Sequence, residues 1–477
     1  MSMNWKQLLS PKRIRSYENT ASAGRGGSDL RSEFEKDYHR IIGSSSFRRL
    51  QDKTQVFALD KSDFIRTRLT HSLEVSSFAK SLGQNIAQYI LDNRLDPDFT
   101  QQTKSDICDI LQCAGLIHDI GNPPFGHFGE EAIRDWFVRN MAGLTYKGRP
   151  VTEIFTGQML QDFYHFEGNA QAFRQVTKLH FLVNENGMNL TYALLNTIVK
   201  YPVASTRIRP DSGNVKDKKM GFFHAEQDLY EEIASETGTL GVRHPLTYIL
   251  EAADDIAYRT ADIEDAFKKG FLNYDQLRSE LVKAKERARY ALDLLDPVEM
   301  LDHQMDTALR RHMENPAQYA VQNFLVRLQS RLLYCATFGF TSNYQKIMDG
   351  TYGSDLFHGT YGDWVIRALG DIAYRYAFLS RQILQMEISA GTILDDMMNR
   401  FIPAVMYYDT EVPLQMMEKK LVRLISENYR QVYHIYSARA RQENERLYLR
   451  FLLATDFISG MTDSYAKDLY QRMNGIV

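Results

Sequence analysis

The sequence contains little cysteine and little proline. Only three cysteines, Cys108, Cys113 and Cys335, occur among 477 residues. So sparse and odd-numbered a set argues against a disulfide framework and favours a reducing compartment. The 12 prolines are few for a chain of this length, and proline interrupts helix interiors. Long uninterrupted helices are therefore possible.

The sequence also lacks long apolar runs and a large excess of charge of either sign. No segment approaches the length of a membrane span, and residues 1–19 contain no apolar core of signal-peptide length. The 57 basic and 60 acidic residues give a formal net charge of -3. This balance argues against a protein dominated by a nucleic-acid-binding field, although a local basic groove is compatible with it. We expect a soluble, cytoplasmic protein without a membrane partner.

Helical periodicity is the main pattern that the sequence does contain. Apolar residues recur at four- and five-residue steps over 69–90 and follow a helical face again over 107–117, where Gly121 and two prolines end the pattern. A third apolar stripe covers 246–257. Clear strand alternation is hard to find, so we predict an all-α protein.

Three polar segments interrupt this pattern and are expected to form loops: residues 18–32, 142–152 and 203–221. Beyond a soft boundary near 270–300 the chain has fewer motifs but keeps its helical character. Three stretches there are rich in Leu, Ile, Tyr, Arg and Gln: residues 319–336, 362–388 and 415–454.

The segment CAGLIHDIGNPPFGHFGEEA (113–132) places His118 beside Asp119 at the end of an apolar helix. Adjacent helical residues point about 100° apart, so two such ligands reach one metal only near a helix end. An imidazole and a carboxylate together suit a divalent cation. By itself, however, the dipeptide indicates no more than a polar pair at a helix terminus.

Two further residues extend this pattern. His71 lies at the start of one predicted helix, and Asp254 lies in another that is otherwise apolar. Burying an unpaired carboxylate there is costly unless it is paired or binds metal. Asp254, Tyr258 and Asp262 are spaced four residues apart and share a helix face. For Asp254, a metal ligand and an ion pair with a nearby arginine are both open.

In this order the residues resemble the His…His-Asp…Asp pattern of the HD-domain superfamily of metal-dependent phosphohydrolases. More closely, the chain resembles the deoxynucleoside triphosphate triphosphohydrolases of the deoxyguanosine triphosphatase family. HDIGNPPFGHFGEEA and HFEGNAQ are specific to that family. The matching stretches follow its order over almost the whole chain: FRRLQDKTQVF (47–57), RTRLTHSLEV (66–75), GLIHDIGNPPFGHFGEEA (115–132), HFEGNAQAFR (165–174), LTYALLNTIVKYP (190–202), KMGFF (219–223), EAADDIAYRTADIEDA (251–266) and ISGMTDSYA (458–466).

The resemblance implies a metal site formed by His71, His118, Asp119 and Asp254. Two imidazoles and two carboxylates leave positions for water and a phosphate oxygen. We expect one divalent ion in each active site, Mn, Mg or a similar metal, and the sequence does not select among them.

It also implies a fold with an HD-domain helical core and an additional, mostly helical C-terminal region. We expect an N-terminal arm over residues 1–32 and a catalytic core over 33–275. Residues 276–477 would form the C-terminal region, which completes the site and supplies oligomer interfaces.

His127 and Glu130 are three residues apart, and Gly126 and Gly129 beside them give the backbone clearance. A histidine oriented by a carboxylate is a good proton donor or acceptor near neutral pH. The resemblance places this pair in the catalytic centre, beside the scissile bond. The simpler alternative is that Glu130 caps the helix after the two prolines.

Residues for binding the substrate follow from the resemblance as well. Triphosphate contacts are expected from five side chains: Arg68, Asn169, Lys200, Tyr201 and Lys219. For a single lysine the plain alternative is a solvated surface charge, and Lys218 beside Lys219 makes that assignment less secure.

Sugar contacts are expected from Gln55, Tyr258 and Asp262. A glutamine and an aspartate hold the 3′-hydroxyl in similar enzymes, and a tyrosine packs where a 2′-hydroxyl would clash. An ordinary core aromatic is the alternative for Tyr258.

The implied activity is a dNTP triphosphohydrolase, similar to a dGTPase. It would hydrolyse a deoxynucleoside triphosphate to deoxynucleoside and inorganic triphosphate by attack of a metal-activated water on the α-phosphorus. The alternatives are another HD-domain phosphohydrolase, a nucleotidase or phosphodiesterase, and a binding protein that senses nucleotides or single-stranded DNA.

The resemblance also implies a homo-oligomer, a tetramer or hexamer. A nucleotide or single-stranded DNA effector is possible, since the Arg- and Tyr-rich segment 436–450 has the composition of a nucleic-acid contact. Ordinary charge on a helix surface is the simpler interpretation of that segment.

Overall fold

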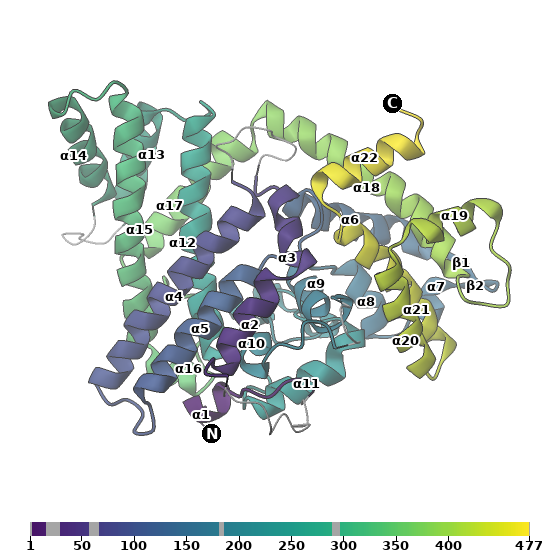
Figure 1. The fold of residues 1–477 in the computed structure, drawn as a ribbon. Helices are drawn as coiled ribbons and strands as arrows, with labels where there is room; N and C mark the ends of the chain where they lie inside the picture. Colours follow the sequence, from purple (N-terminus) through teal and green to yellow (C-terminus); the bar gives the residue numbers. More distant parts are fainter. Residues whose placement is uncertain (1, 16–28, 57–65, 181–185, 289–295, 477) are drawn as a thin grey trace.

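Helices form nearly all of the regular structure, as the periodicity predicts (Figure 1). The computed structural model describes residues 2–15, 29–56, 66–180, 186–288 and 296–476. The α-helices within these residues are α1 (Trp5–Leu8), α2 (Glu33–Ile42), α3 (Ser45–Arg49), α4 (Arg68–Asp92), α5 (Gln101–Ile117), α6 (Gly126–Asn140), α7 (Val151–Ile154), α8 (Gln158–Tyr164), α9 (Gly168–Arg174), α10 (Tyr192–Thr197), α11 (Gln227–Glu236), α12 (Pro245–Lys268), α13 (Tyr274–Arg287), α14 (Pro297–Arg310), α15 (Pro316–Ser342), α16 (Tyr344–Met348), α17 (Asp363–Ala373), α18 (Arg381–Met406), α19 (Met416–Leu424), α20 (Glu427–Arg439), α21 (Glu443–Ser459) and α22 (Asp463–Met473).

Shorter elements join these helices. Two are π-helical turns, η3 (Gln175–Leu179) and η8 (Tyr374–Phe378). The 3-10 turns are η1 (Leu50–Asp52), η2 (Met141–Gly143), η4 (Ser205–Arg207), η5 (Pro210–Ser212), η6 (Val215–Asp217) and η7 (His224–Glu226). Three of them, η4 to η6, lie in the segment 203–221, which was expected to be a loop.

The segment 142–152, also expected to be a loop, instead contains a small hairpin. Strands β1 (Thr145–Tyr146) and β2 (Arg149–Pro150) pair antiparallel, with Thr145 opposite Pro150. Lys147 and Gly148 between them both have positive φ, the backbone conformation of a two-residue hairpin turn. The polar composition indicated the turn, but strands of two residues are too short to show alternation. The all-α prediction is otherwise confirmed.

The three helices predicted most clearly begin at defined caps. The Thr67 side chain accepts a hydrogen bond from the Thr70 backbone N–H at the start of α4, and Thr100 caps α5 in the same way. In α12, His244 is the cap and Pro245 occupies the first turn. Such caps satisfy backbone N–H groups that have no partner inside the helix.

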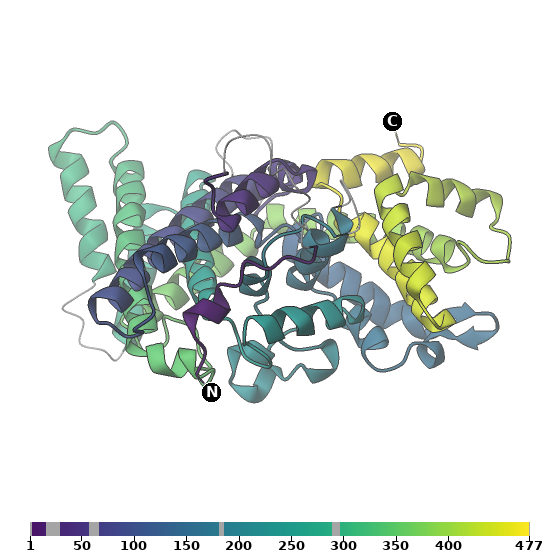
Figure 2. The ribbon, with the colours of Figure 1, turned by 60° about the horizontal axis from the view of Figure 1, so that its bottom comes forward.

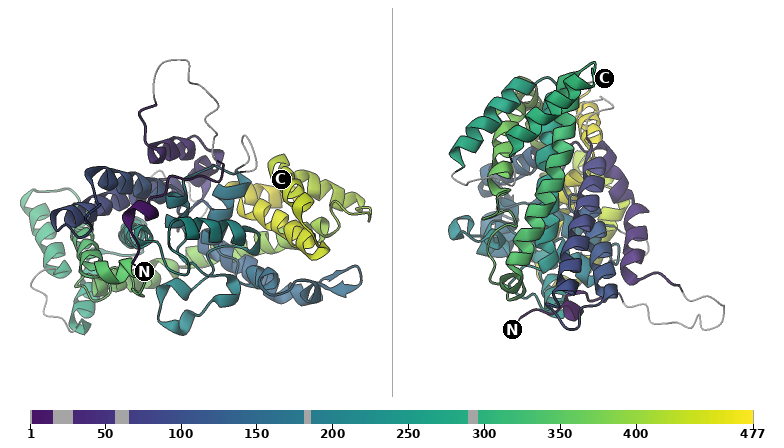
Figure 3. Two further views of the ribbon diagram at one scale, coloured as in Figure 1. Left: turned by 90° about the horizontal axis from the view of Figure 1, so that it is seen from below. Right: turned by 90° about the vertical axis from the view of Figure 1, so that its left-hand side faces the viewer.

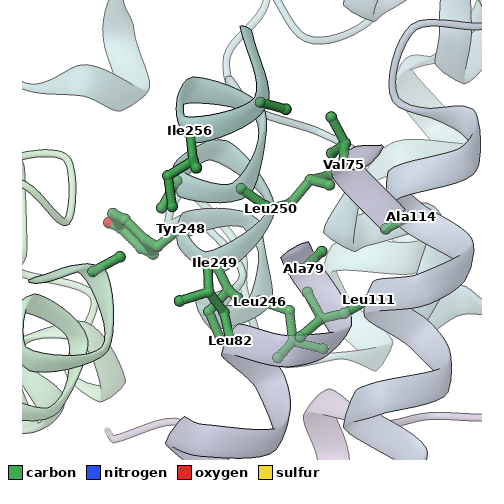
Figure 4. Packing of buried hydrophobic residues seen from close by; sticks show 14 of the residues in the cluster. Val75, Ala79, Leu82, Leu111, Ala114, Leu246, Tyr248, Ile249, Leu250 and Ile256 are labelled. Carbon is green, nitrogen blue, oxygen red and sulfur yellow. The ribbon is translucent and has the colours of Figure 1, made fainter. Parts of the chain in front are cut away.

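Helices α4, α5 and α12 pack together around a shared apolar core (Figure 4). Val75 and Leu82 of α4, Leu111 of α5, and Leu246 and Leu250 of α12 are all buried there. Burying such side chains contributes about 1.5–3 kcal/mol each. The first turn of α4, the end of α5 and the middle of α12 are thereby held close to one another.

Gly115 lets α4 and α5 approach each other closely. A Cβ atom at this position would lie 2.5 Å from the Cα of Ser76 on α4, closer than van der Waals contact permits. The close approach brings the end of α5, which leads into His118, near α4.

A second apolar core joins the middle of the chain to its C-terminal helices. It includes Ile133 and Phe137 of α6, Met397 and Phe401 of α18, and Phe451 of α21. Helices α19–α21 lie at the opposite end of the molecule from α13–α15 (Figures 2 and 3). The later turns of α6 belong to this second core, and Phe125, just before α6, packs against it.

Segment 436–450 was interpreted as a charged helix surface or a nucleic-acid contact, and two of its residues fit neither description. Tyr448 is buried and donates a hydrogen bond to Asp162. Arg450 is buried too and donates to the backbone carbonyl of Met406. Neither is a surface charge or a nucleic-acid contact.

The structure leaves two predictions about the organisation of the chain untested. The loop expected over 18–32 lies mostly outside the described residues, and the division of the chain at 32/33 and 275/276 stays a prediction. None of the described helices has the length and apolar character that crossing a membrane requires.

Candidate active site

His71, His118 and Asp254 converge from three helices. His71 lies in the first turn of α4, His118 directly follows α5, and Asp254 lies in α12. One ligand atom from each lies within 4.8 Å of the others. Oδ1 of Asp254 is 3.2 Å from Nε2 of His71 and 3.4 Å from Nε2 of His118. Two imidazole nitrogens and a carboxylate oxygen thus face a common point.

The hydrogen bonding of His118 fits a metal ligand. Its Nδ1 lies 2.8 Å from the carbonyl oxygen of Gly115, which assigns the ring proton to Nδ1. The lone pair of Nε2 is then free for a metal. This Nε2 is buried and has no hydrogen-bond partner among the described residues, a costly arrangement that a bound cation would relieve. The site suits a divalent ion with mixed nitrogen and oxygen ligands.

Asp119, the fourth predicted ligand, is held by two neighbours. Its Oδ2 accepts a hydrogen bond from Nη1 of Arg68 at 2.5 Å, and its Oδ1 accepts one from Nδ2 of Asn122 at 2.6 Å. Its Oδ1 is also 3.6 Å from Nε2 of His118. Asp119 therefore lies beside the three converging residues but outside their tight cluster, and its role as a ligand stays a prediction.

Asp254 could be a metal ligand or the partner of an ion pair, and the charged groups around it bear on this choice. Nζ of Lys200 lies 3.0 Å from Oδ2 of Asp254, so a lysine and two histidines contact this carboxylate. Of the arginines that could have paired with Asp254, namely Arg66, Arg68 and Arg259, the first two pair with other carboxylates: Arg66 with Glu74 and the acidic residues near the end of α12, and Arg68 with Asp119.

Both aspartates stay ionised. Burial raises the pKa of Asp254, but Lys200 and His118 outweigh it and bring the pKa well below its usual value. For Asp119, too, burial raises the pKa, and His118 and Arg68 lower it further than burial raises it. Two partly buried carboxylates that remain negative favour a cation between them and the histidines.

His127 and Glu130 lie in the first turn of α6. Nδ1 of His127 is 3.5 Å from Oε2 of Glu130, which is the outer limit of a hydrogen bond. The Glu130 side chain is 2% exposed and that of His127 is 67% exposed. The other oxygen of Glu130 accepts a hydrogen bond from the Gly168 N–H at 2.9 Å. Glu130 is thus buried and held in place, and the His127 imidazole beside it is accessible to solvent.

This pair is electrostatically coupled. The hydrogen bond to Glu130 raises the pKa of His127, and it exceeds the opposing effect of burial. Burial raises the pKa of Glu130, but the contact with His127 lowers it below the usual value. The arrangement favours a protonated His127 beside an ionised Glu130, the state that a proton donor needs.

Gly126 and Gly129, on either side of His127, lie in places where there is no room for a side chain. Gly126 has a φ of 64°, and a Cβ there would lie 2.5 Å from Nη2 of Arg68. A Cβ on Gly129 would lie 2.1 Å from the carbonyl oxygen of Pro124. Side chains at these positions would displace the arginine that holds Asp119, or the turn that begins α6.

The predicted triphosphate ligands form two groups. Nζ of Lys219 lies 2.8 Å from Oε2 of Glu167, whose Oε1 accepts a hydrogen bond from Asn169 at 2.8 Å. Burial and the nearby Glu130 raise the pKa of Glu167, and Lys219 opposes this. Lys219 and Asn169 are therefore near Glu130, whereas Lys200 is at Asp254.

Tyr201 is half-buried, and burial raises its pKa. It follows Lys200 directly, and the Lys200 carbonyl accepts a hydrogen bond from Nε of Arg243 at 2.7 Å. The Lys200-Tyr201 backbone is therefore fixed by a buried arginine.

A cavity of about 540 Å³ adjoins the site. Gln55, His127 and Tyr258 line it together with aromatic and apolar side chains of α6, η8 and α18, among them Phe128 and Tyr374. Its size and apolar lining are typical of a small-molecule pocket. It lies within reach of His127 and one turn of α12 beyond Asp254.

The third predicted sugar ligand, Asp262, is not among the residues that line this cavity. It is buried on α12, neither carboxylate oxygen has a hydrogen-bond partner among the described residues, and burial raises its pKa well above the usual value. Gln55 and Tyr258 therefore both line the cavity, and Asp262 does not.

Sequence reasoning missed several residues that contact the site. Asn122 and Glu167 lie inside the quoted stretches and hold Asp119 and Lys219. Lys53 donates a hydrogen bond to the backbone carbonyl of Asn122, and Asp463 contacts the segments before α4 and α6. Their only signal was membership of the family stretches, which gives no role.

Comparison with known proteins gives consistent matches. The family model of the HD domain matches residues 68–182. The deoxyguanosinetriphosphate triphosphohydrolase-like protein of Listeria innocua is 45% identical over 99% of this chain and 100% of its own length, and the protein of that name from Listeria monocytogenes matches equally well. The probable deoxyguanosinetriphosphate triphosphohydrolase of Pseudomonas aeruginosa is 31% identical over 100% of this chain and 99% of its own.

Proposed function

The chain belongs to the HD-domain family of deoxyguanosinetriphosphate triphosphohydrolase-like proteins, and we propose that it hydrolyses deoxynucleoside triphosphates to the deoxynucleoside and inorganic triphosphate. One observation carries this proposal. Arg68 joins the two halves of the site: it pairs with Asp119, beside the cluster of His71, His118 and Asp254, and it lies against Gly126, the residue before His127. His127 in turn lines a cavity large enough for a nucleoside.

A divalent cation held by His71, His118 and Asp254, with Asp119 beside them, would polarise a phosphate oxygen and lower the pKa of a water molecule. The orphaned Nε2 of His118 supports the fit. Mn, Mg or a similar ion meets this requirement equally.

Three positively charged side chains near the site would bind the triphosphate. Lys200, Lys219 and Arg68 each pair with a carboxylate. Phosphate oxygens offer these groups charge-assisted hydrogen bonds of the same kind. Lys200 approaches the site from the Asp254 side and Lys219 from the Glu130 side, so the phosphates would lie between them.

His127 would protonate the leaving group. Hydrolysis at the α-phosphorus breaks its bond to the 5′-oxygen, and the departing oxygen needs a proton. Nδ1 of His127 faces Glu130, so Nε2 is the nitrogen that can deliver it. Glu130 stabilises the protonated imidazole and fixes the ring.

The nucleoside would occupy the cavity. Gln55 and Tyr258 lie on its wall, where an amide can bond a sugar hydroxyl and an aromatic ring can pack against the sugar. Asp262 is part of the proposal only through the resemblance. A homo-oligomer and a nucleotide or single-stranded DNA effector likewise stay predictions.

A panel of the four dNTPs tests the proposal. The purified protein is assayed with Mn²⁺, with Mg²⁺ and with a chelator, and each dNTP is also added as a possible activator of the others. We expect metal-dependent release of deoxynucleoside from at least one dNTP. Hydrolysis of nucleoside monophosphates or cyclic nucleotides alone would favour another HD-domain phosphohydrolase, and binding without turnover would favour a sensor.

A further inference from the structure

The stretch ISGMTDSYA (458–466) has no role in the proposal above, yet it contacts the active-site segments. It joins the end of α21 to the start of α22, which lies beside α3 in Figure 1. At its centre, Asp463 is 1% exposed. Oδ2 of Asp463 accepts hydrogen bonds from the Thr54 N–H at 3.0 Å and from Oγ1 of Thr54 at 2.6 Å. Its Oδ1 accepts one from the Phe125 N–H at 2.9 Å.

Thr54 directly precedes a residue that lines the cavity, and Phe125 lines the cavity itself. Thr54 is followed by Gln55, and Phe125 is followed, after one glycine, by His127. Gln55 and His127 are wall residues of the same cavity. One buried carboxylate therefore joins the segment that carries the predicted sugar ligand to the segment that carries the predicted proton donor.

The Thr54 side of this link extends to α4. Thr54 forms an isolated antiparallel bridge with Thr67, the cap of α4. The backbone N–H of Arg68 donates to the carbonyl of Lys53 at 2.8 Å. Fixing Thr54 therefore also fixes the first turn of α4, which carries Arg68 and His71.

The Phe125 side of the link holds an unusual backbone conformation. Phe125 has a φ of 64°, in the left-handed region that residues other than glycine seldom adopt. It is also the residue before α6, and its side chain forms no cap for that helix. The hydrogen bond to Asp463 is therefore a specific constraint on the turn that places His127.

The same C-terminal stretch makes a second contact with the site. Nζ of Lys53 donates to the carbonyl oxygens of Ser459, at 2.8 Å, and Asn122, at 2.5 Å. The side chain of Asn122 in turn holds Asp119. Ser459 and Asp463 thus reach both sides of the HDIGNPPFGH segment.

We infer that Asp463 is a positioning residue for the reaction: it bridges Thr54 and Phe125 and so sets the distance between Gln55, the first turn of α4 and His127. The inference rests on the proposed function. Asp463 touches neither substrate nor metal in this scheme, and its effect passes entirely through the two backbone segments that it holds.

The substitution Asp463→Asn tests this role. Asparagine keeps the shape but has one acceptor oxygen, so its NH₂ group faces an N–H donor of Thr54 or Phe125. Because small displacements of catalytic groups cost up to about a hundredfold in rate, we expect kcat to fall by about tenfold to a hundredfold. The metal content should stay at the wild-type level, since the predicted ligands are unchanged.

Asp162→Asn is the matched control for a loss of stability. Asp162 is also fully buried and accepts three hydrogen bonds, from Ser205, the His224 N–H and Tyr448. None of these residues lines the cavity. This variant should lower the melting temperature but leave kcat unchanged.

A second pair of variants separates positioning from a general structural role. Thr54→Val removes the hydroxyl donor to Asp463, and Thr54→Ser keeps it. We expect Thr54→Val to lower kcat in the same direction as Asp463→Asn, and Thr54→Ser to restore most of it. An equal loss in both Thr54 variants would contradict the inference.

Wild-type kcat in a folded Asp463→Asn protein would overturn the inference, as would an equal fall in kcat in Asp162→Asn. The crystal structure of the Asp463→Asn variant supplies a readout that needs no substrate. We expect the Phe125 backbone to leave its left-handed conformation and the His127–Gln55 separation to change.

The proposed function and the role of Asp463 can fail separately. If wild-type protein hydrolyses bis(p-nitrophenyl) phosphate with Mn²⁺ but no dNTP, the proposed function fails. The kcat for bis(p-nitrophenyl) phosphate and the crystal structure of the variant then still decide the role of Asp463.

Discussion

The ammonium group of Lys200 lies 3.0 Å from the Oδ2 oxygen of Asp254, so a predicted phosphate ligand and a predicted metal ligand form one partly buried ion pair. Burial lowers the pKa of Lys200, but Asp254 outweighs this effect and raises the pKa above its usual value. The lysine therefore stays charged inside the site. A phosphate oxygen that enters beside the metal ligands would meet this charge directly.

Replacing Lys200 by glutamine should weaken substrate binding more than metal binding. A hydrogen bond to a charged group contributes about 1.5–3 kcal/mol, so we expect the KM for the dNTP to rise about tenfold to a hundredfold. Steady-state kinetics and metal analysis of the same preparation measure both effects. Lys218→Gln, at an exposed lysine, is the control. An unchanged KM, or a loss of bound metal, would show that Lys200 only neutralises Asp254.

Replacing His118 by alanine should abolish both metal binding and turnover. The substitution removes the Nε2 atom that faces Asp254 and His71. Metal content by mass spectrometry and the rate of dNTP hydrolysis are the measurements, and Asp119→Ala should give the same result. His358→Ala, at an exposed histidine, should change neither. Full activity in the His118 variant would refute the site.

The Glu130→Gln variant should shift the pH dependence. Glu130 raises the pKa of His127, and the proposed mechanism needs His127 protonated. Activity is then lost as the pH rises through that pKa. Without the carboxylate the pKa falls, so the basic limb of kcat/KM, which reports the free enzyme, should move to lower pH.

Asp135→Asn, at an exposed carboxylate further along α6, controls for the general effect of removing a negative charge. Its basic limb should coincide with that of the wild type. A limb that stays in place in Glu130→Gln would exclude His127 as the proton donor.

The Tyr258→Ala variant should discriminate less between deoxyribose and ribose. Tyr258 lines the cavity beside Gln55, and its ring is proposed to occupy the space that a 2′-hydroxyl would need. We expect the ratio of kcat/KM for dGTP to that for GTP to fall by about tenfold or more. Tyr258→Phe keeps the ring and should keep the ratio. If the alanine variant retains the wild-type ratio, the discrimination arises elsewhere.

The parts of the site that the sequence predicts well depend on local pattern. Helices α4, α5 and α12 follow from apolar residues repeated at helical spacing, and His71, His118 and Asp254 occupy places on those helices that the pattern defines. Their convergence was expected only from the resemblance. Nothing in the spacing gives the close approach at Gly115 that brings α5 against α4.

The parts that the sequence could not predict depend on contacts between distant residues. Thr54 and Asp463 are 409 residues apart, and no periodicity connects them. Asp119 shows the same limit, because its two partners, Arg68 and Asn122, are set by how α4 meets the turn after α5. Asp262 shares the helix face of Tyr258 but does not line the cavity, since neighbouring elements decide which part of a face is open.

The products formed from dGTP decide whether the protein is a triphosphohydrolase. The wild-type protein is incubated with dGTP and Mn²⁺, and the products are separated by anion-exchange chromatography and assigned by ³¹P NMR. We expect deoxyguanosine and intact inorganic triphosphate in equal amounts, because the bond between the α-phosphorus and the 5′-oxygen is broken. Release of dGMP with pyrophosphate, or of dGDP with phosphate, would contradict the proposed function.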